Sequence, residues 1–524
     1  MAQPADSPRH PSGVPRTPPA WAVHLPAGTD PDGVDLLAEE SLPAAWRRRA
    51  ADAPDRPALW SAATGWLTRG DLERASRRVA GRFHRAGLAA GDRVLCSAAT
   101  SMELVVAYLA ALRLGLVVLP ANTAYLEREI AHVVGDAEPR AAIVDDPARG
   151  EWARKAAGGD LLVTGPEVDL PDGEPPALDL AGRGDPALLC YTSGTTGAPK
   201  GAVLSHGNLL ASAQALRLAW RWSEDDRLVL ALPLFHIHGL GVGLHGTLLA
   251  GASAVLLPRF DVDRVLDAAR DHRATLFFGV PTMYARLAGS PRAGELAALR
   301  LLVSGSAALP PTVFERVAER TGQPVLERYG MTETIMNVSN PYDGERRPGT
   351  VGLPLPGVEL RLAEPDGEVL LRGPNVFGGY WRNPEATAEA FDAGGWFRTG
   401  DLGSLDERGY LRIEGRSKEL IITGGYNVHP REVEELLLEH PAVAEVAVVG
   451  TPSEEWGEVV TAFVVPADPA DPPGEGELLG FAAERLAAFK RPRLVRYLDS
   501  LPRNALGKVV KHELRDRVDP VTGG

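Results

Sequence analysis

The chain has 524 residues, and its 55 Lys and Arg side chains are outnumbered by 69 Asp and Glu side chains, which gives a formal net charge of −14. This balance argues against broad binding to a nucleic-acid backbone, which needs clustered basic side chains, although a few local cations could still serve a small anionic substrate. The length predicts more than one domain, and the 44% hydrophobic content is that of a globular protein with a large core.

Residues 1–30 are rich in proline and contain no long apolar run, so they predict a disordered tail and not a signal peptide. No later segment reaches the ~18 uncharged apolar residues of a membrane span. Cys96 and Cys190 lie in apolar strand-like runs without metal-site spacing, which predicts buried and inert thiols. Together these features predict a reduced protein of the cytoplasm.

Between residues 36 and 304 the sequence alternates helical and strand patterns. Strands joined by helices of about 10–15 residues predict βαβ units and a mostly parallel sheet. Helices are expected at residues 44–53, 72–86, 103–114 and 239–250, and strands at residues 92–97, 117–120, 141–144, 187–191, 227–232, 254–257 and 301–304.

From residue 351 to residue 411 the pattern changes to short strands with Gly and Pro turns, and Asp366-Gly367 is a hairpin signal. A separate unit follows Gly415, with helices expected at 430–440 and 477–488 and strands at 443–449 and 459–465. The predicted fold class is therefore α/β. Residues 31–414 would form a large N-terminal domain of mixed and parallel β-sheets flanked by helices, with a small β-barrel-like part, and residues 415–524 a small α+β domain.

The most informative motif is YTSGTTGAPKG, which spans Tyr191 to Gly201 directly after an apolar strand. It combines four Ser or Thr hydroxyls, three glycines and Lys200 within eleven residues. Glycines let backbone N–H groups turn towards an anion, and the hydroxyls and the lysine add donors and charge for a polyphosphate. A Walker A loop is excluded because Gly201, and not Ser or Thr, follows the lysine. A simple Gly/Ser/Thr turn is the alternative interpretation.

This motif resembles the phosphate-binding signature of the adenylate-forming superfamily, which includes acyl-CoA synthetases, peptide-synthetase adenylation domains and firefly-type luciferases. The resemblance recurs in order from about residue 36 to residue 515. It implies an acid-thiol ligase that uses ATP, Mg²⁺ and CoA and forms an acyl-adenylate. It also implies that the C-terminal domain is a mobile lid with a hinge at Lys418.

The motifs ERYGMTE and WFRTGD carry the nucleotide part of the resemblance. By similarity, Tyr329 would stack on adenine, Thr332 would contact the α-phosphate and act with Glu333 in catalysis, and Asp401 would bind the ribose with Arg416. Mg²⁺ would be held by Glu333 and Thr196; turns with a solvated carboxylate are the alternative for Glu333 and Asp401. The full set implied for ATP or AMP is Thr192, Ser193, Gly194, Thr195, Thr196, Gly197, Lys200, Gly305, Ser306, Ala307, Glu327, Arg328, Tyr329, Gly330, Met331, Asp401 and Arg416.

Two further segments resemble the working parts of the lid. PRNALGK, which ends at Lys508, is similar to the catalytic-lysine loop, where the ammonium would stabilise charge that builds during adenylation. The family also implies that a lysine acetyltransferase and a deacylase could act on Lys508, since acetylation removes the charge. The segment Thr423, Gly424, Gly425, Tyr426 is similar to the loop that approaches CoA. A solvated tail lysine and a plain turn are the alternatives.

The acid is suggested by LPLFHIHG, which contains His236 and His238, and by MTETIMNVSN, which begins at Met331 and contains Met336. Both segments closely resemble malonyl-CoA synthetases, which implies malonate, with methylmalonate as a second acid. His236 would take part in catalysis, and His238 and Met336 would contact the acid. A second carboxylate needs a cation when it is buried. The candidates are Arg259, Arg286 and Arg300, for which surface or inter-helix salt bridges are the alternative.

Three other functions remain open at this point. The chain could be another short- or medium-chain fatty acyl-CoA ligase, or a stand-alone adenylation enzyme that loads a carrier protein. It could also be a non-catalytic ATP-binding regulator, although intact Lys200, Glu333, Asp401 and Lys508 argue against that. One departure from the family is a hairpin between Leu362 and Arg372 that is shorter than usual.

Overall fold

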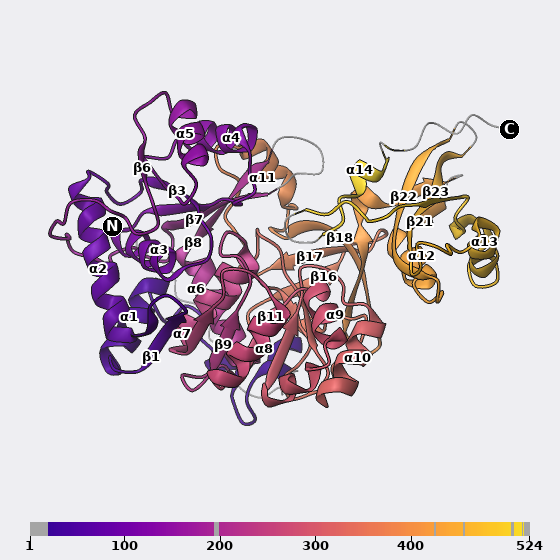
Figure 1. The fold of residues 1–524 in the computed structure, drawn as a ribbon, viewed down its shortest axis with the longest axis horizontal. Coiled ribbons are helices and arrows are strands. Elements are labelled where there is room, and N and C mark those ends of the chain that lie inside the picture. The colour runs from indigo at the N-terminus through magenta and orange to yellow at the C-terminus, as the bar shows by residue number, and fades with distance from the viewer. Residues whose placement is uncertain are drawn as a thin grey trace, which may run out of the picture.

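The computed structural model describes residues 19–192, 199–423, 426–453, 456–504, 508–515 and 517. It has a large N-terminal part built on three sheets and a smaller C-terminal part that projects beside the β16–β19 sheet (Figure 1). The α/β fold class with a large and a small domain is therefore confirmed.

A six-stranded sheet carries the strand pair on either side of the phosphate motif. Its order is β6-β5-β3-β4-β7-β8, and every pairing is parallel except that of β7 with β8. The antiparallel β7–β8 pair brings Thr192 opposite Lys200, so the two ends of the motif face each other. The strands are β3 (Arg93–Ser97), β4 (Val117–Pro120), β5 (Ala141–Val144), β6 (Leu162–Thr164), β7 (Pro186–Thr192) and β8 (Lys200–Ser205).

A nine-stranded sheet supplies the other wall, in the order β15-β14-β13-β12-β11-β9-β10-β1-β2. Its centre, from β13 to β1, is parallel, so the carboxyl ends of these strands meet at one edge, where open α/β sheets bind ligands. The strands are β1 (Pro57–Ser61), β2 (Gly65–Thr68), β9 (Arg227–Leu230), β10 (Ser253–Leu256), β11 (Leu276–Gly279), β12 (Leu301–Ser304), β13 (Leu326–Tyr329), β14 (Val338–Ser339) and β15 (Leu353–Pro354).

Helices separate and cover the two sheets. Helix α3 is buried along almost its whole length, as its continuous apolar sequence predicts, and it shares one core with strands of both sheets. The Gly-rich helix predicted at 239–250 is a π-helical segment, η3 (His238–Leu244), that continues into α7 (His245–Ala250). The other helices of the large part are α1 (Leu42–Asp52), α2 (Arg69–Arg85), α3 (Met102–Leu114), α4 (Glu127–Ala137), α5 (Pro147–Ala156), α6 (His206–Ala219), α8 (Val262–Asp271), α9 (Pro281–Gly289), α10 (Pro311–Thr321) and α11 (Pro384–Ala390).

The part predicted to be barrel-like is an antiparallel four-stranded sheet, β16 (Glu359–Leu362), β17 (Glu368–Arg372), β18 (Phe397–Leu405) and β19 (Leu411–Arg416). The C-terminal part has its own core around strands β20 (Ile421–Thr423), β21 (Tyr426–Val428), β22 (Val443–Ser453), β23 (Gly457–Pro466) and β24 (Leu494–Tyr497). Its helices are α12 (Pro430–Leu437), α13 (Glu475–Ala483) and α14 (Lys511–Arg515). Residues 417–419 connect the two cores as the short 3₁₀ turn η5, which places Lys418 where the hinge was predicted.

The predicted tail is wrong for its last third. Ala20–His24 form a 3₁₀ turn, and His24 and Leu25 are buried. The His24 ring lies 3.2 Å (Nε2 to O) from the Leu353 carbonyl, and Arg221 donates to the carbonyls of His24 and Leu25. These contacts bury the segment although its proline content is typical of a tail; residues 1–18 lie outside the described part of the chain.

Within the described ranges, no helix combines the length and the apolar character that crossing a membrane requires.

Candidate active site

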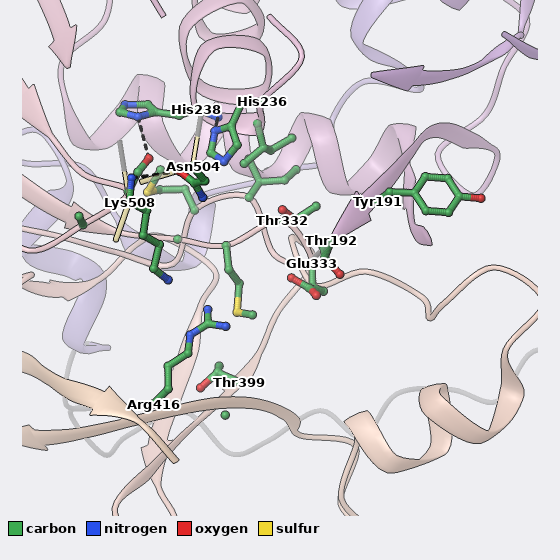
Figure 2. Close-up of a pocket in the computed structure, with 18 of the residues that line it drawn as sticks. Tyr191, Thr192, His236, His238, Thr332, Glu333, Thr399, Arg416, Asn504 and Lys508 are labelled. Atoms are coloured by element: carbon green, nitrogen blue, oxygen red, sulfur yellow. Dashed lines mark hydrogen bonds between the residues drawn. The ribbon is translucent and has the colours of Figure 1, made fainter. Parts of the chain in front are cut away.

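A cleft of about 970 Å³ lies between the large part and the C-terminal part. Its walls come from the ends of β7, β8, β12 and β13, from β18 and β19, and from the C-terminal segment that carries Asn504 and Lys508. Figure 2 shows the histidines, Lys508 and Arg416 facing a common space with Thr192 and Glu333. The segment that carries Asn504 and Lys508 and the two ends of the phosphate motif therefore meet in one cavity, although more than 300 residues separate them in sequence.

The two ends of the phosphate motif lie at the cleft. Thr192 and Lys200 both line it, and the Lys200 ammonium lies 5.4 Å from the centroid of the Tyr380 ring. Helix α4 contacts both ends of the motif: the Tyr191 hydroxyl donates to Asp136 at 2.5 Å, and the His132 ring lies 2.8 Å (Nε2 to O) from the Pro199 carbonyl. Ser193, Gly194, Thr195, Thr196 and Gly197 lie outside the described residues.

Thr332 and Glu333 follow the carboxyl end of β13 and line the same cleft. The Glu333 side chain is 6% exposed, its Oε1 accepts a hydrogen bond of 3.0 Å from the Tyr380 hydroxyl, and burial raises its pKa. No group of three or more His, Cys, Asp or Glu side chains among the described residues could hold a metal ion. The single carboxylate of Glu333 is nevertheless compatible with Mg²⁺, because this ion takes one or two carboxylates and completes its coordination shell with water and substrate phosphates.

Asp401 and Tyr329 lie next to the cleft. It is lined by their neighbours Gly330, Gly400 and Arg416. The Asp401 carboxylate accepts from Arg416 Nε at 3.0 Å and from the Tyr329 hydroxyl at 2.5 Å. The structure thus brings together three residues predicted for adenine and ribose, and holds the Asp401 carboxylate rigidly.

Lys508 reaches the cleft from the lid. Its backbone N–H donates to Asn504 Oδ1 at 3.0 Å. Three residues further on, the Lys511 ammonium lies 2.7 Å from Glu434 and 3.5 Å from Glu419, and so ties the segment to α12 and to the residue after the hinge. The Lys508 side chain is exposed, yet the protein around the cleft and the Arg416 cation both lower the pKa of its ammonium.

The cleft wall on the histidine side is formed by His236, His238, Ser306 and Arg328. His238 Nδ1 lies 3.1 Å from the Ser306 hydroxyl, and burial lowers the pKa of His236 to about 4, so both rings are neutral at pH 7. Arg328 is 4% exposed, and its Nε and Nη2 have no hydrogen-bond partner among the described residues. Burial lowers the pKa of Arg328 to about 9, which still leaves a cation at neutral pH. This wall therefore holds one buried, incompletely paired positive charge.

Gly305 makes room for that charge. A Cβ at Gly305 would lie 2.4 Å from the Arg328 guanidinium carbon, so a larger residue there would displace the guanidinium. Ala307 and Met331 line the cleft with Met336, whereas Glu327 is buried and accepts a hydrogen bond of 2.9 Å from the Leu309 N–H.

None of the three arginines predicted to bind the acid lines the cleft, and their role stays a prediction. Arg300 forms a bidentate ion pair with Asp226, in which both nitrogen–oxygen distances are 2.7 Å. Arg286 is exposed and lies 5.0 Å from the Phe260 ring centroid, and Arg259 is exposed. Arg300 directly precedes β12 and Arg286 lies on α9, and the sequence alone does not reveal in which direction such side chains point.

The predicted CoA segment lies away from the cleft in this arrangement of the lid. Thr423 and Tyr426 pair across the β20–β21 hairpin, and Tyr426 is 56% exposed, with its ring 4.8 Å from that of Phe489. Gly424 and Gly425 lie outside the described residues.

One contributor to the site was missed from sequence. Tyr380, which bonds Glu333 and lies beside Lys200, belongs to a Gly-Gly-Tyr-Trp run that resembles a plain turn. Arg328 was predicted for the nucleotide; it lines the cleft together with His236 and His238, and its role stays a prediction.

Comparison with known proteins agrees with this geometry. The model of the family "AMP-binding enzyme" matches residues 46–381, and that of the "AMP-binding enzyme C-terminal domain" matches residues 432–508. A feruloyl-CoA synthase from an Amycolatopsis species is 38% identical over 485 residues, which cover 90% of this chain and 97% of that protein.

Two solved structures are also similar. ATP-bound MatB from Rhodopseudomonas palustris has a TM-score of 0.86 at 42% identity, covering 91% of this chain and 98% of that chain. A malonyl-CoA ligase with methylmalonyl-CoA and AMP bound has a TM-score of 0.62 at 46% identity, covering 86% of this chain and 97% of that chain.

Proposed function

We propose that this chain, which belongs to the AMP-binding enzyme family and is an AMP-forming acyl-CoA ligase, activates malonate and, as a second acid, methylmalonate. As a member of this class it uses ATP, Mg²⁺ and CoA. The observation that carries the choice of acid is the buried Arg328 guanidinium in the cleft wall on the histidine side.

A dicarboxylate explains why that charge is there. A buried cation without a partner is unfavourable, and a carboxylate placed beside the guanidinium would offset its charge. The neutral His238–Ser306 pair can add donors to the same oxygens. A monocarboxylate would use its only carboxylate at the phosphate and leave Arg328 unpaired, which selects against it. The similar malonyl-CoA ligase supports this reading, while the similar feruloyl-CoA synthase is the main argument for a monocarboxylate.

In the first half-reaction, one carboxylate oxygen of the acid forms a bond to the α-phosphorus of ATP. The bond from that phosphorus to the bridging oxygen breaks, and pyrophosphate leaves with the bonding electrons. Lys508 and Arg416 place two cations at the same side of the cleft, where negative charge builds on the phosphate oxygens. Mg²⁺, which Glu333 would hold, neutralises further phosphate charge when it is bound.

In the second half-reaction, the CoA thiolate forms a bond to the acyl carbon, and the carbon–oxygen bond to AMP breaks. In the present arrangement Lys508 occupies the cleft and the β20–β21 hairpin lies outside it. We propose that the lid turns about Lys418, withdraws Lys508 and brings Thr423–Tyr426 to the cleft. The better structural match to an ATP-bound relative than to a more identical product complex supports two lid positions.

Acetylation of Lys508 by a lysine acetyltransferase, reversed by a deacylase, stays a prediction. It would act by removing the positive charge of the Lys508 ammonium.

The two free and buried cysteines fit the predicted cytoplasmic location.

The acid is tested by measuring AMP formation with malonate, methylmalonate, acetate, octanoate, benzoate and ferulate, each with ATP, Mg²⁺ and CoA. We expect kcat/KM for malonate to exceed that for every monocarboxylate by at least about tenfold, because only a dicarboxylate pairs with Arg328. A higher kcat/KM for acetate, octanoate, benzoate or ferulate would contradict the proposed acid.

The same assay separates the other functions. Replacing CoA by a phosphopantetheinylated carrier protein should give little product, whereas an adenylation enzyme for carrier loading would prefer it. Acid-dependent exchange between pyrophosphate and ATP should be present, and its absence with every acid would favour a non-catalytic ATP-binding protein.

A further inference from the structure

The wall of the cleft next to the histidines contains a residue in an unfavourable backbone conformation. Ile335 has φ of +59°, in the left-handed region, which a β-branched side chain rarely adopts. Its side chain is 1% exposed and lines the cleft together with that of Met336. Backbone strain of this kind persists only where the surroundings impose it, and it is concentrated at functional sites.

The sequence makes space for this conformation from two sides. A Cβ at Gly330 would lie 2.2 Å from the Ile335 carbonyl oxygen, so only glycine at position 330 allows the carbonyl to turn inward. A Cβ at Gly241 would lie 3.2 Å from Ile335 Cγ2, so the side chain packs directly against η3, the segment that begins with His238. The conformation of Ile335 therefore decides how close this wall stands to the acid end of the cleft.

Asn375 supplies the contacts that hold the conformation in place. Its side chain is buried, and its Nδ2 lies 2.8 Å from the Thr334 carbonyl oxygen and 3.0 Å from the Met336 carbonyl oxygen. One amide group thus donates to the carbonyls on both sides of Ile335. The backbone N–H of Phe377 adds a hydrogen bond of 2.8 Å to the Glu333 carbonyl, so the loop 374–377 is fixed along the segment from Glu333 to Met336.

The loop that carries Asn375 is itself held in the same manner. Asn208 Nδ2, on α6, donates to the Pro374 and Val376 carbonyls, both at 2.8 Å, which again flank a single residue. The Asn208 side chain also caps α6 through Ser205, at the end of strand β8 that begins at Lys200. Two asparagines therefore connect the helix after the phosphate motif to the wall of the acid pocket.

We propose that Asn375 is a positioning residue that keeps Ile335 in its left-handed conformation and thereby sets the size of acid that the cleft accepts. It acts through Ile335 and Met336 and does not touch the reacting atoms. This role rests on the proposed function, because it presupposes that the protein activates an acid. Asn375 would affect which size of acid is accepted, and not the recognition of a second carboxylate.

The test is Asn375→Asp, which keeps the shape and replaces the donor by an oxygen that faces two carbonyls. We expect the ratio of kcat/KM for malonate over a bulkier malonate, such as butylmalonate, to fall by about tenfold or more, while KM for ATP stays within about twofold. The matched control is Asn383→Asp, since Asn383 only caps α11 by accepting from the Ala386 N–H and aspartate caps equally well. An unchanged acid ratio in a folded Asn375→Asp protein would overturn the inference.

A comparison of the stability of two Ile335 variants does not require the Asn375→Asp protein to fold. Glycine adopts a left-handed conformation without strain and alanine does not, so Ile335→Gly should unfold at a higher temperature than Ile335→Ala, the reverse of the usual order. In the Ile335→Gly background, Asn375→Asp should change the acid ratio much less than in the wild type. Equal or greater stability of Ile335→Ala, or an undiminished effect of Asn375→Asp, would show that Asn375 has no such role. Failure of the wild type to activate any acid would instead contradict the proposed function.

Discussion

Replacing Lys508 by alanine is expected to slow adenylation by about 10²–10³-fold while thioester formation from supplied malonyl-adenylate and CoA continues. The ammonium lies with Arg416 on one side of the cleft, where negative charge develops as the α-phosphate is attacked. Removing one preorganised donor of this kind costs about 10²–10³-fold in rate. The second half-reaction uses the other lid position, in which Lys508 has left the cleft, so its rate should change by no more than about twofold on the same scale.

The two half-reactions are measured separately, as malonate-dependent exchange of pyrophosphate into ATP and as thioester formation from malonyl-adenylate. Lys155→Ala is the matched control, because Lys155 is an exposed lysine on α5 that pairs with Glu127. Equal losses in both half-reactions of Lys508→Ala would show that Lys508 has a different role from the one proposed.

Replacing Arg328 by methionine is expected to lower kcat/KM for malonate by at least ~30-fold, because truncating one partner of a buried charge pair costs about 2–5 kcal/mol. Activity with a monocarboxylate of similar size, such as butyrate, should be unchanged or higher, since its terminal methyl group would then meet an apolar wall. The protein should not lose stability, because Arg328 is a buried cation whose Nε and Nη2 lack partners in the described part of the chain.

Steady-state kinetics with malonate and butyrate, together with the thermal unfolding midpoint, check this prediction. Arg264→Met is the control, because that exposed arginine on α8 stands outside the cleft and its loss should not alter the kinetics with either acid. If Arg328→Met and the wild type distinguished malonate from butyrate equally well, another group would have to bind the second carboxylate.

The layered α/β architecture could be predicted because it follows from local patterns. The apolar run at residues 103–114 and the short strands around it specify βαβ units, and they form α3 between β3 and β4. The segment at residues 20–25 could not be predicted, because its burial depends on Leu353 and Arg221, which are distant in sequence.

The residues of the candidate site were also only partly predictable from sequence. Thr192, Lys200, Thr332, Glu333 and Lys508 were predicted from motifs, and all of them line one cleft. The direction of a side chain next to a strand was not predictable from sequence: Arg300, a candidate for the acid, pairs with Asp226, and Arg328, a candidate for the nucleotide, lines the cleft. Positioning by Asn375 depends on three segments that meet only in the folded chain.

The central claim, that malonate is activated by direct attack on the α-phosphate of ATP, is tested most directly by following oxygen. Malonate labelled with ¹⁸O in its carboxylates is incubated with the protein, ATP, Mg²⁺ and CoA, and the nucleotide and phosphate products are analysed by mass spectrometry. The account predicts AMP that carries one labelled oxygen, because the attacking oxygen stays on phosphorus when the thiolate takes the acyl group. Label in inorganic phosphate with formation of ADP, or AMP without label, would contradict it.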